Sequence, residues 1–206
     1  MKKSGYNMSF TAASLRVNES VQIIQAAGEL GLSDLSQIPG KLELIGGGNS
    51  RTATRQFREI RKRLDLLTPP QRELLATDNL DTQRQLCFLS VCKLYGFVRD
   101  FTVEVLREKM LVFDYTLGYE DYDIFYNRKQ QDHPELEELT ESTRKKIRQV
   151  TFKMLEQAGM VINTKGNYTI QMQFPTQPLI DVVVQDNPEW LKIFLYTDYQ
   201  IKQIMQ

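Results

Sequence analysis

The residues most suggestive of chemistry stand in a glycine-rich stretch that leads into an arginine-rich segment. Residues 42–64 read LELIGGGNSRTATRQFREIRKRL, an apolar run followed by three glycines and a helical pattern. That order is typical of a phosphate-binding loop, but the Walker motif needs a glycine where Arg51 stands and a lysine where Thr52 stands. Arg51 also replaces the third glycine of the dinucleotide fingerprint. The sequence therefore argues against a nucleotide cofactor at this loop.

Other reactive side chains are few and lack partners at useful spacings. His133 is the only histidine, precedes Pro134 in an acidic stretch, and has no serine or cysteine partner recognisable from the sequence. Cys87 and Cys92 lie about 140° apart on a helix, a spacing that fits neither a metal site nor a redox pair, so we expect buried free thiols. We therefore expect no catalytic residue, no metal, no cofactor and no small-molecule substrate, and a protein that is not an enzyme.

Charge is balanced overall but unevenly distributed along the chain. The sequence has 26 basic and 26 acidic residues. Residues 51–63 hold six basic and one acidic residue, and residues 142–153 hold five basic residues and no acidic one. Residues 119–141 between them hold eight acidic and two basic residues. Such blocks indicate charged surfaces that the net charge hides.

The first basic block predicts an amphipathic helix with a cationic stripe. With Phe57 at 0° and 100° per residue, a core-facing set falls within about 80° of it: Ala53, Ile60, Leu64 and Leu67. A second set falls about 100° to 160° away: Arg51, Arg55, Arg58 and Lys62. Cations that share a helix face repel one another, and Glu59, the one acid in this segment before Asp65, falls at about 200°. This favours contact with a polyanion over a solvated face or pairing with the acidic block. The preceding Asn49 and Ser50 suit helix capping, and the glycines leave backbone donors open to an anion.

The second basic block predicts a helix over residues 140–158, followed by a β-hairpin wing over 160–174. The expected buried face is Ile147, Val150, Thr151, Met154, Leu155 and Ala158. The expected polar face is Ser142, Lys145, Lys146, Gln149 and Lys153, with Arg148 at its edge. Lys165 and Gly166 occupy the predicted hairpin turn. Phe152 falls on the polar side of this helix, which indicates a contact with the N-terminal domain.

Helices followed by a basic helix and a hairpin are the order of a winged helix-turn-helix. In that fold the last helix enters the major groove. Arginine and lysine suit guanine and phosphate, glutamine suits adenine, and serine suits phosphate. The candidate nucleic-acid contacts are therefore Arg51, Arg55, Arg58, Lys62, Ser142, Lys145, Lys146, Arg148, Gln149, Lys153 and Lys165. The alternative is a winged helix that makes only protein contacts.

The chain is long enough for one large or two small domains. We expect a mainly α protein with a helical N-terminal domain over residues 1–80, which contains a basic helix over 50–67. A winged-helix-like domain follows over residues 81–206 and includes C-terminal helices. The start of the chain has no apolar segment typical of a signal peptide. The longest apolar run is residues 86–92, whereas a membrane span needs about 20 residues, so we expect a cytoplasmic protein without a membrane partner.

Three stretches together resemble the BrxA family, a small component of bacteriophage exclusion (BREX) defence systems. They are MSFTAASL near the start, SRTATRQFREIRKRLDLLT, and LTESTRKKIRQVTFKMLEQAGMV. The resemblance runs from about residue 8 to the C-terminus. It implies a mostly helical, non-enzymatic, DNA-binding protein that acts beside a methyltransferase, an ATPase and a phosphatase-like protein. Its helical part is similar to an RNA-binding antitermination protein, which is a likeness of fold.

Residues and resemblance together predict a double-stranded DNA binder that tolerates different sequences, with other BREX proteins as further partners. Two alternatives stay open. The basic stripes could dock onto an acidic surface of a BREX partner, which would make the chain a protein-interaction adaptor. The chain could also bind RNA.

Overall fold

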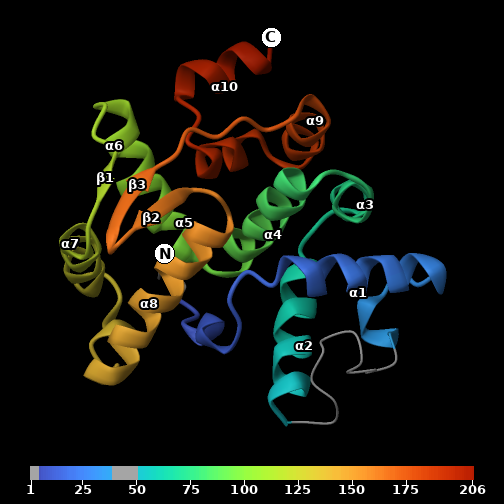
Figure 1. Ribbon diagram of the computed structural model, residues 1–206, viewed down its shortest axis with the longest axis horizontal. Helices are drawn as coiled ribbons and strands as arrows, with labels where there is room; N and C mark the ends of the chain where they lie inside the picture. The colour runs from blue at the N-terminus through green and yellow to red at the C-terminus, as the bar shows by residue number, and fades with distance from the viewer. Residues whose placement is uncertain (1–4, 39–50) are drawn as a thin grey trace.

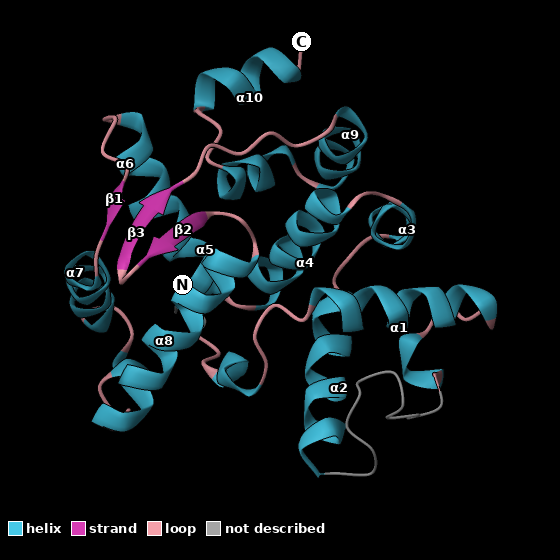
Figure 2. Cartoon of the chain, viewed as in Figure 1, coloured by secondary structure: helices cyan, strands magenta, loops and turns pink. Residues whose placement is uncertain are grey.

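The computed structural model describes residues 5–38 and 51–206 of the chain. Helices make up most of the chain, and a small antiparallel sheet lies at the left of the view (Figures 1 and 2), which confirms the predicted mainly α fold. In the first part lie the 3-10 turn η1 (Ser9–Ala12), α1 (Val17–Glu29), the 3-10 turn η2 (Leu35–Gln37), α2 (Arg51–Leu64) and α3 (Pro69–Thr77). Then follow α4 (Leu80–Leu94), α5 (Gly96–Phe101), the π-helical segment η4 (Thr102–Arg107), α6 (Glu108–Leu111) and β1 (Thr116–Leu117). The remaining elements are α7 (Tyr119–Gln130), η5 (Pro134–Leu136), α8 (Glu141–Gln157), β2 (Val161–Thr164), β3 (Asn167–Ile170), α9 (Gln177–Asp186), η6 (Pro188–Phe194) and α10 (Asp198–Ile204).

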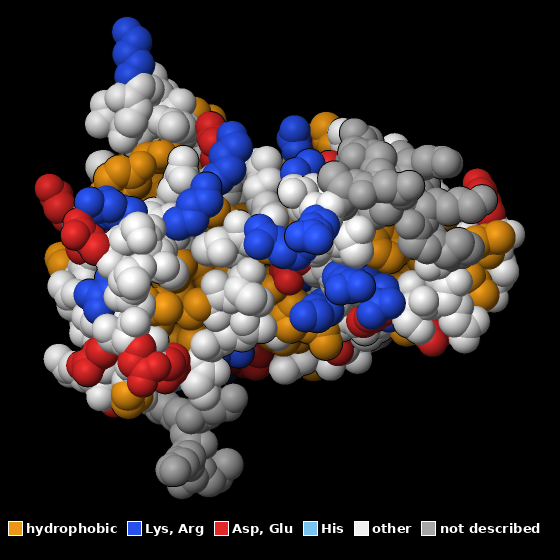
Figure 3. Space-filling model, turned by 90° about the horizontal axis from the view of Figure 1, so that it is seen from below, with side chains coloured by type: hydrophobic (Ala, Val, Ile, Leu, Met, Phe, Trp, Pro, Cys, Tyr) orange, Lys and Arg blue, Asp and Glu red, His pale blue; other side chains and the backbone are white. Residues whose placement is uncertain are grey.

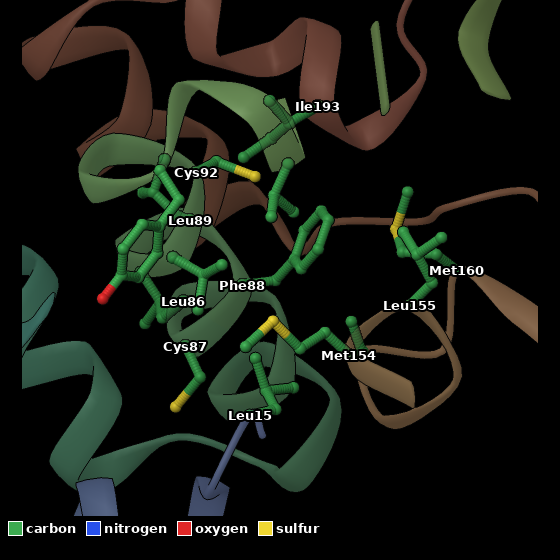
Figure 4. Packing of buried hydrophobic residues seen from close by; sticks show 14 of the residues in the cluster. Leu15, Leu86, Cys87, Phe88, Leu89, Cys92, Met154, Leu155, Met160 and Ile193 are labelled. Atoms are coloured by element: carbon green, nitrogen blue, oxygen red, sulfur yellow. The ribbon is translucent and has the colours of Figure 1, made fainter. Parts of the chain in front are cut away.

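Helix α4 lies in the middle of the core. Its N-terminus is capped by Asn79, whose side chain accepts hydrogen bonds from the backbone of Asp81 and Thr82. Every residue from 86 to 92 is buried, and the helix packs against α1, α2, α3 and α5. Figure 4 shows its side chains meeting residues from α8 and η6. The expected domain boundary after residue 80 falls at the start of α4, directly after the α3–α4 junction, and the division into two domains stays a prediction.

Both cysteines lie on this central helix. Cys87 and Cys92 are free and buried, which confirms the expectation of buried thiols. Burial raises the pKa of the Cys87 thiol to about 12, and it raises the pKa of Cys92 as well. Both thiols therefore stay protonated and unreactive at neutral pH.

The sheet has one more strand than the hairpin predicted from the sequence. Strands β2 and β3 form that hairpin, with Val161 opposite Ile170 and Thr164 opposite Asn167. The two-residue strand β1 pairs with the other side of β3, which gives the antiparallel order β1-β3-β2. A strand this short has too few residues for an alternating pattern. The hairpin strands end at Ile170, so the last residues of the predicted wing, 171–174, lie outside the sheet.

Phe152 corrects one expectation about α8. Its side chain is 1% exposed and belongs to an aromatic cluster within the second half of the chain. The ring centroids of its neighbours lie between 4.7 and 6.2 Å away: Phe101, Tyr119, Tyr122 and Tyr168. The expected contact of Phe152 with the N-terminal domain is therefore wrong. The predicted polar side of α8 is in part covered, because α7 and the sheet pack against it.

The C-terminal elements pack against helices of the first half. Gln71 of α3 is buried and donates to the carbonyl of Val182 on α9 at 3.1 Å. Lys93 of α4 pairs with Asp186 at the end of α9 at 2.7 Å. Asn187 caps η6 by accepting from the backbone of Glu189. These contacts fix the tail and leave α8 and the lower end of α2 uncovered by it (Figure 1).

Candidate nucleic-acid interface

Helix α2 exposes the whole predicted cationic stripe. Its core-facing residues are buried as expected: Ala53, Phe57, Ile60 and Leu64, followed by Leu67. Its cations on the opposite side are all exposed: Arg51, Arg55, Arg58 and Lys62. Periodicity alone thus placed the apolar stripe and the cationic stripe of this helix, but not the buried Glu59 and Arg63. The proposed caps and anion donors at residues 46–50 lie outside the described residues.

No carboxylate of the described residues forms an ion pair with this stripe. Glu59 stands four residues after Arg55, the spacing at which the two could pair on the helix surface. Instead Glu59 is 5% exposed and pairs with Arg63 at 3.0 Å. Its carboxylate also accepts a hydrogen bond from the buried Tyr95 hydroxyl. The positive charge of the stripe therefore faces solvent.

The buried Arg63 also fixes the chain segment that lies between α2 and α8. Its guanidinium donates to the carbonyl oxygens of Ser14 and Ala13 at 2.7 and 2.8 Å. On the other side, the side-chain oxygen of Gln157, at the end of α8, accepts from the backbone of Leu15 at 2.9 Å. Residues 13–15 are thus tied to both basic helices, which sets the distance between them.

Helix α8 exposes the polar face that the sequence predicts. Thr140 caps it by accepting from the backbone of Thr143. The predicted inward residues are all buried: Ile147, Val150, Thr151, Met154, Leu155 and Ala158. The predicted outward residues are all exposed: Ser142, Lys145, Lys146, Gln149 and Lys153.

The cations of α8 differ in how far they are neutralised. Lys145 pairs with Glu141 at 2.6 Å, and Lys153 pairs with Glu156 at 3.0 Å. Both pairs are solvent-exposed, and such pairs hold their partners weakly. Lys146 instead donates to the side-chain oxygen of Gln149 at 3.1 Å. All three lysines can therefore turn toward an anion at little cost.

Arg148 is more firmly held than the sequence suggests. Its guanidinium makes two hydrogen bonds to the carboxylate of Asp123 on α7, at 2.9 and 3.0 Å. It also lies over the ring of Tyr119, 4.5 Å from the centroid. The structure therefore places Arg148 at the α7–α8 contact, beside the exposed face and not at its centre.

Lys165 stands at the tip of the hairpin. Lys165 and Gly166 have φ values of 53° and 91°, the positive pair expected of a type I′ turn. The side chain of Asn163 accepts from the backbone of Gly166 at 2.9 Å and closes the turn. Lys165 is exposed at the end of the hairpin, so its ammonium group is available to an anion.

A groove of 420 Å³ lies where α2, α8 and the hairpin meet. We call it the η1 groove, because residues 11–14 of η1 and the segment after it line one side. Its other lining residues are Arg16, Gln56, Tyr119, Lys146, Gln149, Val150, Lys153, Glu156, Asn163 and Tyr168. Three of the predicted contacts, Lys146, Gln149 and Lys153, thus share one groove. Figure 3 shows Lys and Arg side chains gathered across this underside of the molecule.

Several lining residues of the η1 groove had no signal in the sequence. Gln56 follows Arg55 on α2, and because a helix turns by about 100° per residue, Gln56 lies outside the cationic stripe. Asn163 and Tyr168 face the groove from the hairpin strands, and Arg16 precedes α1. Burial and a hydrogen bond with Tyr119 raise the pKa of Tyr168 to about 12, so its ring stays neutral. Helical periodicity cannot detect such residues, because they come from four separate segments.

The cationic stripe of α2 lies beside the η1 groove and not inside it. Only Gln56 of α2 lines the groove, and the wheel places the four cations about 100° to 160° away from it. The structure therefore brings the α8 lysines and the hairpin together, and leaves the α2 stripe on the adjoining surface. A ligand that contacts all of them must be extended.

The chain matches the family model described as BrxA over residues 4–187. The protein belongs to the BrxA family. One relative is the BREX protein BrxA of Bacillus cereus (strain H3081.97), which is 27% identical over 120 residues. That alignment spans 58% of each chain. The fold is similar to the crystal structure of an uncharacterized protein from Magnetospirillum magneticum, with a TM-score of 0.74 and 17% identity over 93% of this chain and 98% of the other.

The side chain of His133 is buried among neighbouring side chains of the fold. Its ring is 5% exposed, accepts or donates at Nδ1 with Glu135 at 3.0 Å, and stacks on Tyr6 at a centroid distance of 3.8 Å. Within residues 5–38 and 51–206, no three or more His, Cys, Asp or Glu side chains are grouped so that they could hold a metal ion. The helices of these same residues are too short or too polar to cross a bilayer.

Proposed function

We propose that this chain is a non-enzymatic, double-stranded DNA-binding component of a BREX phage-defence system in the cytoplasm. The observation that carries the proposal is the extended cationic face formed by α2, α8 and the hairpin tip. Its cations are exposed, and those of the α2 stripe form no ion pair with a carboxylate among the described residues. A face of this length suits a polymer of phosphates better than a compact ligand. Membership in the BrxA family and the name of the Bacillus cereus relative support the BREX context.

We infer that α7, α8 and the three strands form a winged helix-turn-helix. The order α5–α6, β1, α7, α8 and then the β2–β3 hairpin supports this. The α7–α8 connection, residues 131–140, is longer than the turn of about 3–4 residues in simpler helix-turn-helix proteins. In this proposal the exposed face of α8 enters the major groove, and Lys165 contacts the DNA backbone.

Most of the contacts in this proposal go to phosphate. Lysine and arginine on α2 and Lys165 carry no base information, so they position the protein without selecting a sequence. Gln149 is the exception, because a glutamine amide can pair with the edge of adenine. We therefore expect tight but sequence-tolerant binding.

The deciding experiment measures binding to a labelled duplex by fluorescence anisotropy at a series of salt concentrations. If about six phosphates are neutralised, log K falls with log salt at a slope near −5. Competition with single strands and with structured RNA separates DNA from RNA binding. A flat salt dependence, or no binding at low salt, contradicts the proposal.

The α2 stripe offers a matched comparison. A variant with Arg55→Ala, Arg58→Ala and Lys62→Ala should weaken binding to all duplexes alike and make the salt slope shallower by about 3. The control removes three cations elsewhere: Arg84→Ala, Arg99→Ala and Lys202→Ala. The control should leave the slope unchanged. If the stripe variant binds DNA normally but loses a nuclease-resistant BREX partner, the chain is an adaptor instead.

A further inference from the structure

A patch of exposed apolar residues surrounds the end of α6. Val112 and Phe113 follow the helix and are 72% and 80% exposed. Ile124 of α7 is 69% exposed and lines the same hollow as Val112. Side chains of this size contribute little to the core when they stand in water. Their position therefore needs another explanation.

Phe113 is also held in an unfavourable backbone conformation. Its φ is 59°, in the left-handed region that bulky residues avoid. The backbone of Asp114 donates to Lys109, and that of Phe113 donates to Met110. This pair of bonds is the Schellman motif, in which glycine is the usual residue at the position of Phe113. A phenylalanine here strains the turn and gains no burial in return.

Between α6 and α7 lies a notch of 350 Å³. Val112 and Ile124 stand at its sides, and the buried Phe125 contributes to its lining. Apolar walls around a hollow of this kind are typical of a pocket that receives an apolar side chain of a partner. Phe113 is not among the lining residues, but it follows Val112 and is 80% exposed, so its ring is available to a bound side chain.

The rim of the notch is acidic. Four carboxylates lie in its lining or in the adjoining turn: Glu104, Glu108, Asp114 and Asp121. They face two lining cations, Lys109 and Arg128. Both cations are already paired, Lys109 with Asp114 and Asp121, and Arg128 with Glu104. Glu104 and Glu108 are paired as well, with Lys129 at 2.6 Å and with Arg107 at 3.3 Å. Three of these four cations, Arg107, Lys109 and Lys129, are at most 20% exposed, whereas the four carboxylates are 27–58% exposed. The exposed rim is therefore more negative than positive, which favours a basic partner.

We propose that this notch docks a basic amphipathic segment of a partner protein. One apolar side chain of the segment enters between Val112 and Ile124, and its lysines or arginines meet the acidic rim. Such helix-in-groove recognition needs an apolar stripe with charged flanks. Helix α6 lies at the upper left of Figure 1, whereas α8 and α2 lie below.

The probe is a 16-residue amphipathic helix of leucine and lysine, tested by calorimetry against three variants of the full chain. Phe113→Gly and Ile124→Ser should each weaken its binding at least tenfold. Phe174→Ala removes another exposed aromatic residue outside the notch and should leave binding unchanged. Phe113→Gly should also raise the thermal midpoint by about 2–4 °C, because strain is relieved. A residue with only a structural role would not combine higher stability with lost binding.

Two further peptides separate the alternatives. A leucine–glutamate peptide should not bind, and an alanine–lysine peptide should bind at least tenfold more weakly than the leucine–lysine one. Equal binding of the leucine–lysine peptide to wild type and to both notch variants overturns the proposal. Loss of a dimer in sedimentation of Phe113→Gly, with peptide binding retained, also overturns it and assigns the notch to a second copy of this chain. DNA binding of Phe113→Gly should match wild type, so this test is independent of the proposed function.

Discussion

Arg63 and Glu59, one turn apart on α2, form an ion pair at 3.0 Å although their side chains are only 2% and 6% exposed. The pair is fully hydrogen-bonded, because Arg63 also reaches two carbonyls and Glu59 accepts from Tyr95. Two consequences follow. Glu59 is removed from the surface where it would neutralise Arg55, and the segment at Ala13 and Ser14 is fixed beside the η1 groove. A buried charge pair thus keeps the exposed charges unpaired.

Removing one member of this pair should destabilise the protein strongly. Glu59→Gln leaves the buried Arg63 without a counter-charge, which costs about 3–5 kcal/mol of unfolding free energy. Urea unfolding followed by circular dichroism measures the change. The double variant Glu59→Leu, Arg63→Met should lose less than the sum of the two single variants, since it leaves no unpaired charge. Strict additivity would show that the two residues do not act as a pair.

The raised pKa of Tyr95 predicts how the unfolding free energy changes at alkaline pH. Burial, together with the hydrogen bond to Glu59, raises the pKa of Tyr95 to about 12. In the unfolded chain the pKa is about 10, so the folded state holds the proton more tightly. This contribution is complete below pH 10 and is lost as the pH rises from about 10 to 12. Over that range the unfolding free energy of Tyr95→Phe should fall less steeply than that of wild type. Parallel curves would contradict the role of this hydroxyl.

Phe152 should be among the most important core residues of the second half. Phe152→Ala removes a ring that contacts four aromatic neighbours and should cost about 3–5 kcal/mol. Phe174→Ala removes a ring that is 80% exposed and should change stability by less than about 0.5 kcal/mol. Urea titrations of both variants in the same buffer measure these two changes in unfolding free energy. A small effect at Phe152 would mean that α7 and the sheet do not depend on this contact.

Helical periodicity placed the apolar and cationic stripes of α2, because each repeats over about three to four turns, but it did not indicate that Glu59 and Arg63 are buried. The same reasoning separated the inward and outward residues of α8. It failed at Phe152, which lies on the polar side when α8 is considered alone but is covered by α7 and the sheet in the fold. Burial at that position depends on elements far away in the sequence, and a single-helix pattern does not contain them.

The η1 groove shows the other limit of the sequence. Lys146 and Gln149 were predicted as contacts because they share a helix face. Gln56, Asn163 and Arg16 were not, since each stands on a separate segment with no repeating pattern. The strand β1 was missed for a related reason, because its two residues pair with β3 only through tertiary structure. Charge patterns therefore predict faces, whereas a groove between segments needs the fold.

Lys165 allows charge and turn geometry to be separated. Lys165→Asn creates an asparagine–glycine pair, the preferred sequence of a type I′ turn. The hairpin should therefore keep its stability or gain slightly, although one cation is lost. If Lys165 contacts a phosphate, the affinity for duplex DNA should fall for every sequence, and the salt slope should become shallower by about 1. Lys202→Asn on α10 is the control, because it removes the same charge from another surface. An unchanged slope in Lys165→Asn, with the hairpin intact, would exclude the wing from the DNA contact and restrict the interface to α2 and α8.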